Sequence, residues 1–142
     1  PGLSHGCWDW RFHWGMVQDW HARRLREISA AHGRNGLTLA DVDYWELNEA
    51  FAAQVLGCQA AWKDDAYCRE QLDLPGAYGA IDEARLNVDG GAVSIGHPVG
   101  ASGARIVLHL LHVLRRNNAK RGVATICIGG GLGGAMLLEA GG

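Results

Sequence analysis

Apolar residues in this chain come in short runs whose spacing predicts alternating strands and helices. The run 42–47 is rich in aromatic and branched residues and predicts a strand, and the apolar runs 122–129 and 133–139 predict two more strands towards the end of the chain. The run 104–114 carries apolar side chains on most of its circumference, which predicts a buried helix.

Shorter signals complete the order of elements. Thr38 suits the cap of a short helical turn, and Asn48 and Glu49 suit the N-cap and the first turn of a longer helix. The acidic stretch 63–84 predicts a solvated excursion with a short helix, and 85–88 predicts a brief strand. The order of strand, helix, loop, strand, helix, strand, strand predicts a layered α/β domain with a mixed sheet.

Length and charge limit the classes of function. The chain has 142 residues, the size of one domain or of a piece of a longer protein. It begins at Pro1 without a signal segment or a run of about 18 apolar residues, so we expect neither secretion nor a membrane partner. A net charge of -2 argues against a nucleic-acid partner.

Cysteines and histidines give no metal site. Close paired spacing of the zinc or thioredoxin kind is absent among Cys7, Cys58, Cys68 and Cys127, so we expect reduced thiols and a cytoplasmic location, although disulfides remain compatible with the sequence. The histidines near the start of the chain fit no known metal geometry. The first twenty residues follow no strand or helix pattern, whereas the composition of 20–32 suits a helix that stops at Gly33. We leave 1–35 unassigned as a domain.

The glycine-rich stretch 90–103 has the composition of a binding or catalytic site. Glycine allows positive φ and close approach of the backbone to a ligand, at an entropic cost that argues against its use without need. Pro98 biases His97 away from helical geometry and suits the first turn of a helix, so His97 should lie on a bend directly before one. Taken alone, such a histidine is more often a structural turn residue.

Cys127 ends a predicted buried strand and is followed by three glycines. The segment 129–134 formally satisfies G-x-G-x-x-G, but a dinucleotide fingerprint must open a helix, and here a strand-like run follows. We expect instead that the bare backbone presents N–H groups to an anionic oxygen. The alternative is that Cys127 is a small apolar filler.

Three motifs in order resemble those of the C-terminal half of the thiolase family, the acyl-CoA C-acyltransferases. They are Asn48-Glu-Ala-Phe51, Gly96-His-Pro98 and Cys127-Ile-Gly-Gly-Gly131, and the resemblance covers about 36–139. It implies a thiolase-like layered α/β fold, with a mixed sheet of the five-stranded type and a buried central helix. It also implies that 36–142 is a partial thiolase C-terminal domain.

The resemblance implies a catalytic role for four residues. His97 would take a proton from a nucleophilic cysteine and, with a water held by Asn48, stabilise the enolate of an acyl-CoA. Cys127 would exchange the α-proton, and the Gly129 N–H would help to stabilise the tetrahedral intermediate.

Three further residues, Phe51, Gly96 and Pro98, would contact the substrate. The substrates would be acyl-CoA and coenzyme A, with no further cofactor and no metal, in reversible Claisen condensation and thiolysis. A homodimer or homotetramer is implied for the whole enzyme.

The nucleophilic cysteine of the family has no counterpart here. None of Cys7, Cys58 and Cys68 lies in a matching motif, so we expect a fragment that is inactive without an N-terminal half. The main alternative is a noncatalytic CoA-binding or interaction module of the same fold. A β-ketoacyl synthase would need a second motif histidine, and a Ser-His hydrolase would need a G-x-S-x-G elbow, which is absent.

Overall fold

The computed structural model describes residues 37–129 and 132–140. The expectations for residues 1–35 lie outside this part of the chain. In order, the elements are the 3-10 turn η2 (Leu39–Asp41), β1 (Tyr44–Leu47), α2 (Ala52–Lys63), α3 (Asp65–Leu72), the 3-10 turn η3 (Glu83–Arg85), α4 (Ala92–Ile95), α5 (Val99–Arg116), β2 (Arg121–Gly129) and β3 (Leu132–Glu139).

The strands form one mixed sheet in the order β1-β2-β3. β1 pairs with β2 in parallel, with Leu47 opposite Thr125, and β2 pairs with β3 antiparallel. The mixed sheet is as predicted, but within the described residues it has three strands, not five. The brief strand expected over 85–88 is wrong: η3 ends at Arg85, and Leu86 makes a single parallel bridge to Trp45 before the chain turns.

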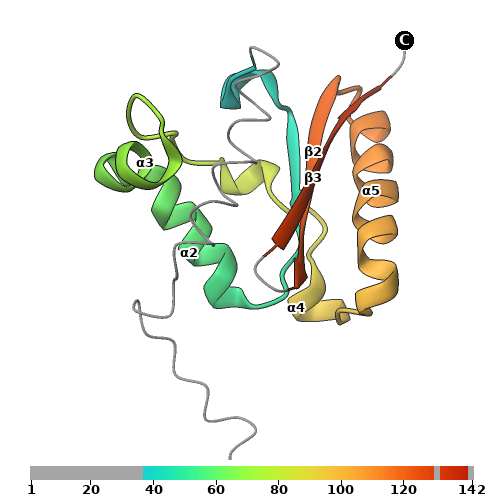
Figure 1. The fold of residues 1–142 in the computed structure, drawn as a ribbon. Helices are drawn as coiled ribbons and strands as arrows, with labels where there is room; N and C mark the ends of the chain where they lie inside the picture. The colour runs from blue at the N-terminus through green and yellow to red at the C-terminus, as the bar shows by residue number, and fades with distance from the viewer. Residues whose placement is uncertain (1–36, 130–131, 141–142) are drawn as a thin grey trace, which may run out of the picture.

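Helices cover both faces of the sheet, as Figure 1 shows, with α5 on one face and α2 and α3 on the other. Successive side chains of β2 point to opposite faces of the sheet. Val123 therefore packs in the core beneath α2 and α3, and Ala124 packs in the core beneath α5. Gly122 lets Leu110 of α5 approach closely, since a Cβ at Gly122 would lie 2.8 Å from a Leu110 methyl carbon.

α5 is buried along the side that faces the sheet, whereas apolar residues on its outer side are exposed. Ser102, Ile106, Leu110, Val113 and Leu114 are buried. On the other side, Leu108 is 58% exposed and Leu111 is 41% exposed. A helix that lies on one face of a sheet covers only the stripe that touches the sheet, and no further layer of described residues covers the outer side.

Several local predictions are confirmed. The N–H and hydroxyl of Thr38 both donate to Asp41 at 2.7 Å around η2. The acidic excursion contains α3, and the carboxylate of Asp64 caps it by accepting from the Tyr67 N–H at 2.8 Å. The segment after Cys127 continues as β3, so rejecting a dinucleotide fingerprint was correct.

Two capping predictions are wrong. α2 begins at Ala52 with Phe51 in the N-cap position, so neither Asn48 nor Glu49 opens this helix. The Asn48 side chain instead contacts His97, and the Glu49 side chain accepts from Asn87.

None of the helices in 37–129 is long and apolar enough to cross a membrane.

Candidate functional site

The motif segments meet at one edge of the sheet. Because β1 and β2 are parallel, their carboxyl ends lie together, and the Asn48 N–H donates to the Thr125 carbonyl at 2.9 Å. Cys127 follows two residues later on β2. Figure 1 shows α4 and the start of α5 below this same edge. The carboxyl edge of parallel strands is where ligands bind in open α/β sheets.

Asn48 and His97 are in contact across 49 residues of sequence. Asn48 is 2% exposed, and its Nδ2 lies 3.4 Å from His97 Nε2. The Asn48 Oδ1 is buried and has no hydrogen-bond partner within the described ranges. Buried polar atoms are nearly always satisfied, so an orphan acceptor beside a histidine suits a group that binds water or substrate.

His97 lies on a bend directly before α5, as the sequence predicts. Gly96 has φ +85°, a region that favours glycine, and Pro98 is the N-cap residue of α5, just before its first turn. Arg105 Nη2 donates to the Gly96 carbonyl at 2.7 Å, and His97 Nδ1 lies 2.7 Å from the Ser102 hydroxyl oxygen. The turn is therefore fastened to α5 at two points.

Glu49 connects the β1 end to the segment before α4. Its carboxylate accepts from Asn87 Nδ2 and from the Val93 N–H, both at 3.0 Å. The Asn87 side chain also pairs with both the N–H and the carbonyl of Leu47, each at 2.9 Å. Asn87 thus extends the pairing of β1 with a side-chain amide. This role of Asn87 was not predicted from the sequence; in the structure its backbone has an unusual φ of +46°.

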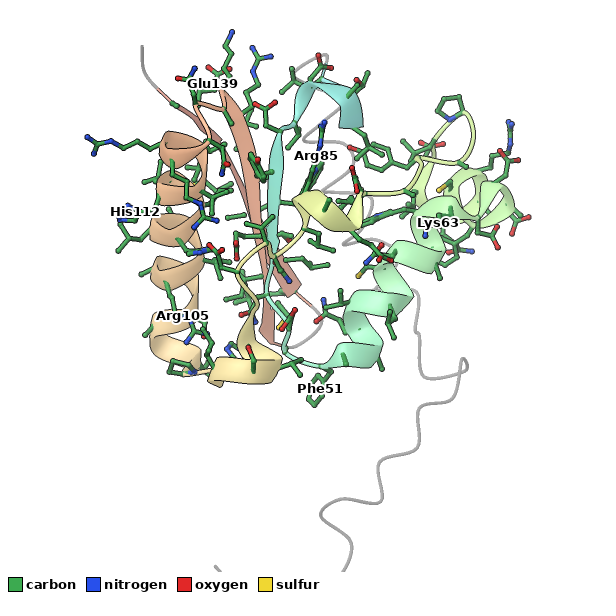
Figure 2. The ribbon with its side chains drawn as sticks, turned by 180° about the vertical axis from the view of Figure 1, so that it is seen from behind. Phe51, Lys63, Arg85, Arg105, His112 and Glu139 are labelled. Carbon is green, nitrogen blue, oxygen red and sulfur yellow. The ribbon has the colours of Figure 1, made fainter. Side chains whose placement is uncertain are left out.

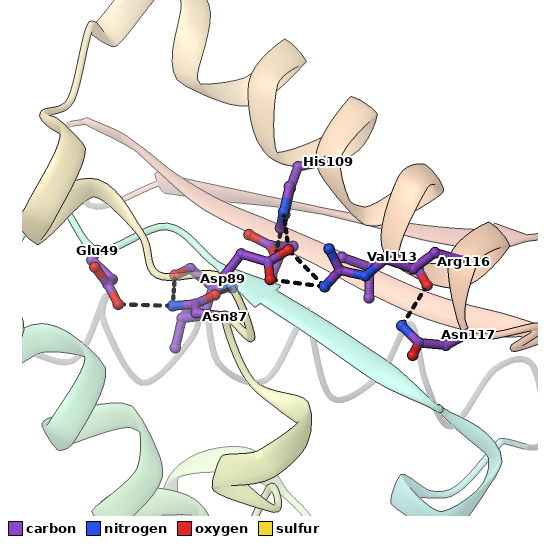
Figure 3. A network of polar contacts seen from close by, with 9 residues as sticks. Glu49, Asn87, Asp89, His109, Val113, Arg116 and Asn117 are labelled. Atoms are coloured by element: carbon purple, nitrogen blue, oxygen red, sulfur yellow. Dashed lines mark hydrogen bonds and ion pairs between the residues drawn. The ribbon is translucent and has the colours of Figure 1, made fainter.

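A second polar network, drawn in Figure 3, joins α5 to the sheet and to the 87–91 segment. His109 Nδ1 lies 2.7 Å from Glu46 Oε1, and His109 Nε2 lies 2.8 Å from Asp89 Oδ2. Arg116 completes the chain through a 2.7 Å ion pair with Asp89. None of these four residues was predicted from the sequence to be a site residue.

The two carboxylates of this network have opposite pKa shifts. Burial raises the pKa of Glu46, although the hydrogen bond from His109 partly offsets this effect. Hydrogen bonds from Arg116 and His109 lower the pKa of Asp89. A cavity of about 200 Å³ beside the network is lined by Glu46, Asn48, Asp89, Arg105 and His109, together with the glycine pair 90–91 and apolar residues. His97 and Cys127 are not among its lining residues.

Cys127 and Gly129 lie at the exposed end of β2. Cys127 is exposed, and a register shift between Cys127 and Gly129 interrupts the pairing with β3. Gly129 has φ +102°, and no atom stands within 4 Å of the place a Cβ would take. No hydrogen bond joins Cys127 to His97 in the described structure, and the shared catalytic role of Asn48, His97, Cys127 and Gly129 stays a prediction.

Phe51, which is predicted to contact the substrate, lies on the surface. Phe51 is 73% exposed, and Figure 2 shows it pointing outward at the end of the molecule where α2 begins. Burial raises the pKa of the Cys58 thiol, which does not favour a reactive thiolate there. The described residues contain no cluster of three or more side chains suited to hold a metal ion.

Comparisons with known proteins agree on one family. Residues 24–140 match the family described as "Thiolase, C-terminal domain". The chain is 46% identical over 106 residues to a 3-ketoacyl-CoA thiolase of Erwinia tasmaniensis, and 45% identical over 107 residues to one of Salmonella typhimurium. Each alignment covers 75% of this chain and 24% of the relative, so the chain spans about a quarter of their length.

Solved structures show the same likeness. A crystal structure of human mitochondrial 3-ketoacyl-CoA thiolase has a TM-score of 0.67 at 39% identity, and covers 86% of this chain and 27% of its own. A structure of that enzyme in complex with CoA has a TM-score of 0.68 at 39% sequence identity. The match covers 87% of this chain and 27% of the human chain. The family match begins at residue 24, inside the segment that we left unassigned, and the domain boundary near 36 stays a prediction.

Proposed function

This chain belongs to the thiolase family, and from that membership we propose that it supplies the α-proton base and the enolate-stabilising groups of an acyl-CoA C-acyltransferase. The observation that carries the proposal is the contact of Asn48 with His97 beside a buried, unpartnered amide oxygen. His97 Nε2 would first take the proton of the nucleophilic cysteine, and its N–H, together with a water held by the Asn48 side chain, would then donate to the thioester oxygen as it becomes an enolate.

The proposed condensation proceeds through an enolate that attacks an acyl-enzyme. The Cys127 thiolate takes the α-proton of one acyl-CoA, so a C–H bond breaks and an S–H bond forms. The enolate carbon attacks the thioester carbonyl of an acyl group carried by a cysteine of the N-terminal half. A C–C bond forms, the C–S bond breaks, and that cysteine leaves as a thiolate; thiolysis is the reverse.

Preorganised donors are what make this chemistry feasible. An α-proton beside a thioester is too weakly acidic for a thiolate unless the enolate charge is stabilised, and each aligned donor contributes on the order of 3 kcal/mol. The exposed Gly129 backbone is proposed to donate to the tetrahedral intermediate on the partner cysteine. Acyl-CoA and coenzyme A are the proposed ligands, which agrees with the CoA complex of the human mitochondrial relative.

The outer side of α5 supports the proposal of a complementary N-terminal half. Val99 is 78% exposed, and Leu108 and Leu111 are also exposed on this amphipathic helix. An apolar helix face of this kind is usually covered by another layer of structure. We propose that the complementary half covers it, within a homodimer or homotetramer of the whole enzyme in the cytoplasm.

Complementation tests the proposal. The chain is combined with an N-terminal half of a 3-ketoacyl-CoA thiolase that carries the nucleophilic cysteine, and CoA-dependent loss of acetoacetyl-CoA is followed. We expect thiolysis from the complex, none from either half alone, and loss of activity with His97→Ala. A folded complex that binds CoA without thiolysis would contradict the proposal and would favour the noncatalytic CoA-binding module.

A further inference from the structure

Ser102 is fully buried in the first turns of α5, directly behind His97. Its Oγ lies 2.7 Å from His97 Nδ1 and 3.1 Å from the Pro98 carbonyl oxygen, to which it is placed to donate. A buried serine that touches the back of a site histidine has two possible effects: it can fill space, or it can fix where the imidazole proton resides.

The single hydrogen of the Ser102 hydroxyl can be donated either to the Pro98 carbonyl or to His97 Nδ1, and this choice sets the tautomer of His97. A serine hydroxyl has one hydrogen, and a carbonyl oxygen can only accept. If the Ser102 hydrogen goes to the Pro98 carbonyl, the usual bond of a helical serine to the residue four positions earlier, then Ser102 Oγ must accept from His97 Nδ1–H. His97 Nε2 then carries the lone pair.

Asn48 requires the same tautomer from the other side of the ring. Its Nδ2 is a donor only and faces His97 Nε2 at 3.4 Å, so Nε2 must accept. This arrangement makes three hydrogen bonds and leaves one buried acceptor, Asn48 Oδ1, unpartnered. With the amide and the tautomer both reversed, only two hydrogen bonds remain, because the Ser102 hydrogen then goes to His97 Nδ1 instead of the Pro98 carbonyl. Neither hydrogen of the buried Asn48 amide nitrogen then has an acceptor, so this arrangement is costlier.

We propose that Ser102 is a positioning residue that holds neutral His97 in the Nδ1–H tautomer, with the Nε2 lone pair directed towards Asn48. The tautomer follows from the geometry alone, whereas its value for catalysis rests on the proposed function. A base must present its lone pair to the proton that it removes, and the hydrogen bond at the opposite ring nitrogen sets which nitrogen does so.

Nitrogen NMR of the chain itself tests the tautomer without any activity. The histidines are labelled with 15N, and spectra are recorded under alkaline conditions in which free imidazole is neutral. The His97 signals are assigned by their loss in His97→Asn. We expect a protonated Nδ1 and an unprotonated Nε2 in the unmodified chain, and a shift towards Nε2 protonation in Ser102→Ala.

Two further variants separate positioning from packing. Ser102→Thr keeps the hydroxyl and should retain the Nδ1–H tautomer. Ser94→Ala removes another serine that donates to a backbone carbonyl, at 2.9 Å, and should leave the His97 signals unchanged. A protonated Nε2 in the unmodified chain would overturn the proposal, as would an unchanged tautomer in a folded Ser102→Ala variant.

Kinetics in the complemented enzyme then test the catalytic meaning. Ser102→Ala should lower the rate of acylation of the partner cysteine by on the order of tenfold to a hundredfold at saturating substrate, with KM little changed, and Ser102→Thr should restore it. Full activity of Ser102→Ala with an altered tautomer would contradict the positioning role in catalysis. Absence of activity in every variant, with the Nδ1–H tautomer intact, would contradict the proposed function alone.

Discussion

The carboxylate of Glu49 fills the space that any side chain at Gly91 would need. A Cβ built on Gly91 would lie 2.5 Å from Glu49 Cδ, closer than non-bonded carbon atoms approach. Gly91 has φ -148°, an extended value open to any residue, so the restriction is steric and comes from Glu49. The glycine is therefore needed to bring the 91–96 segment against the end of β1.

Gly91→Ala should displace Glu49 and break its bonds to Asn87 and Val93. We expect the free energy of unfolding to fall by about 1–3 kcal/mol, the range for overpacking a well-packed site. Gly57→Ala is the matched control, because no atom lies within 4 Å of its Cβ position inside α2, and it should raise stability by about 0.5–1 kcal/mol. Urea unfolding followed by circular dichroism measures both, and equal effects would contradict the steric argument.

The one-sided burial of α5 predicts opposite sensitivities for two of its leucines. Leu110 is fully buried against Gly122, so Leu110→Ala should cost about 2–5 kcal/mol in the free energy of unfolding. Leu108 is 58% exposed, so Leu108→Ala should change stability by less than about 0.5 kcal/mol. A similar loss in the free energy of unfolding for both variants of the isolated chain would contradict the exposure of the outer face of α5.

The Glu46 and Asp89 carboxylates should give opposite dependences of stability on pH. Burial raises the pKa of Glu46 in the folded chain above its ordinary value of 4.5, so the folded state binds more protons than the unfolded state in the pH range between the two pKa values. Stability from this group is fully present below the ordinary value and is lost as pH rises through the folded pKa. Glu46→Gln should remove this decline, which denaturant unfolding at a series of pH values measures.

Asp89 contributes with the other sign. Hydrogen bonds lower its pKa in the folded chain, so its contribution to stability is present above the ordinary value of 3.8 and is lost as pH falls through the folded pKa. Asp89→Asn should therefore reduce stability near neutral pH and flatten the acid limb of the profile. A profile in which both variants change the same limb would contradict the assignment of these shifts.

Thiol accessibility should rank the three cysteines of the described region. Cys127 is exposed, whereas Cys68 is fully buried and burial raises the pKa of Cys58. Iodoacetamide should therefore alkylate Cys127 first under native conditions, the half-buried Cys58 more slowly, and Cys68 only on unfolding. Mass mapping after a short reaction measures the order, and early modification of Cys68 would contradict its full burial in the core beneath α2 and α3.

The sequence was informative wherever a local rule determines the structure. The bend at His97 follows from Gly96 and Pro98, and β2 and β3 follow from long apolar runs. Local rules gave wrong predictions where contacts between distant segments determine the conformation. Asn48 is a good N-cap by composition, yet its side chain bonds His97 from a distant segment, and α2 starts later at Ala52.

The parts of the site that sequence reasoning missed are long-range polar pairs. Asn87 and Leu47 are 40 residues apart, and His109 and Glu46 are 63 apart. No periodicity or cap signal encodes such partners. The sequence also does not reveal which apolar side of α5 faces the sheet, because Leu108 and Leu111 are as apolar as the buried Leu110 and Leu114.

The central claim, that this chain holds the α-proton base and the enolate donors, is tested most directly by deuterium exchange at the α-carbon of acetyl-CoA. The chain is complemented with a nucleophile-bearing half and placed in heavy water. We predict that Cys127→Ala abolishes exchange while acylation of the partner cysteine stays measurable, and that Asn48→Ala slows exchange. Exchange at the unmodified rate in Cys127→Ala would contradict the account.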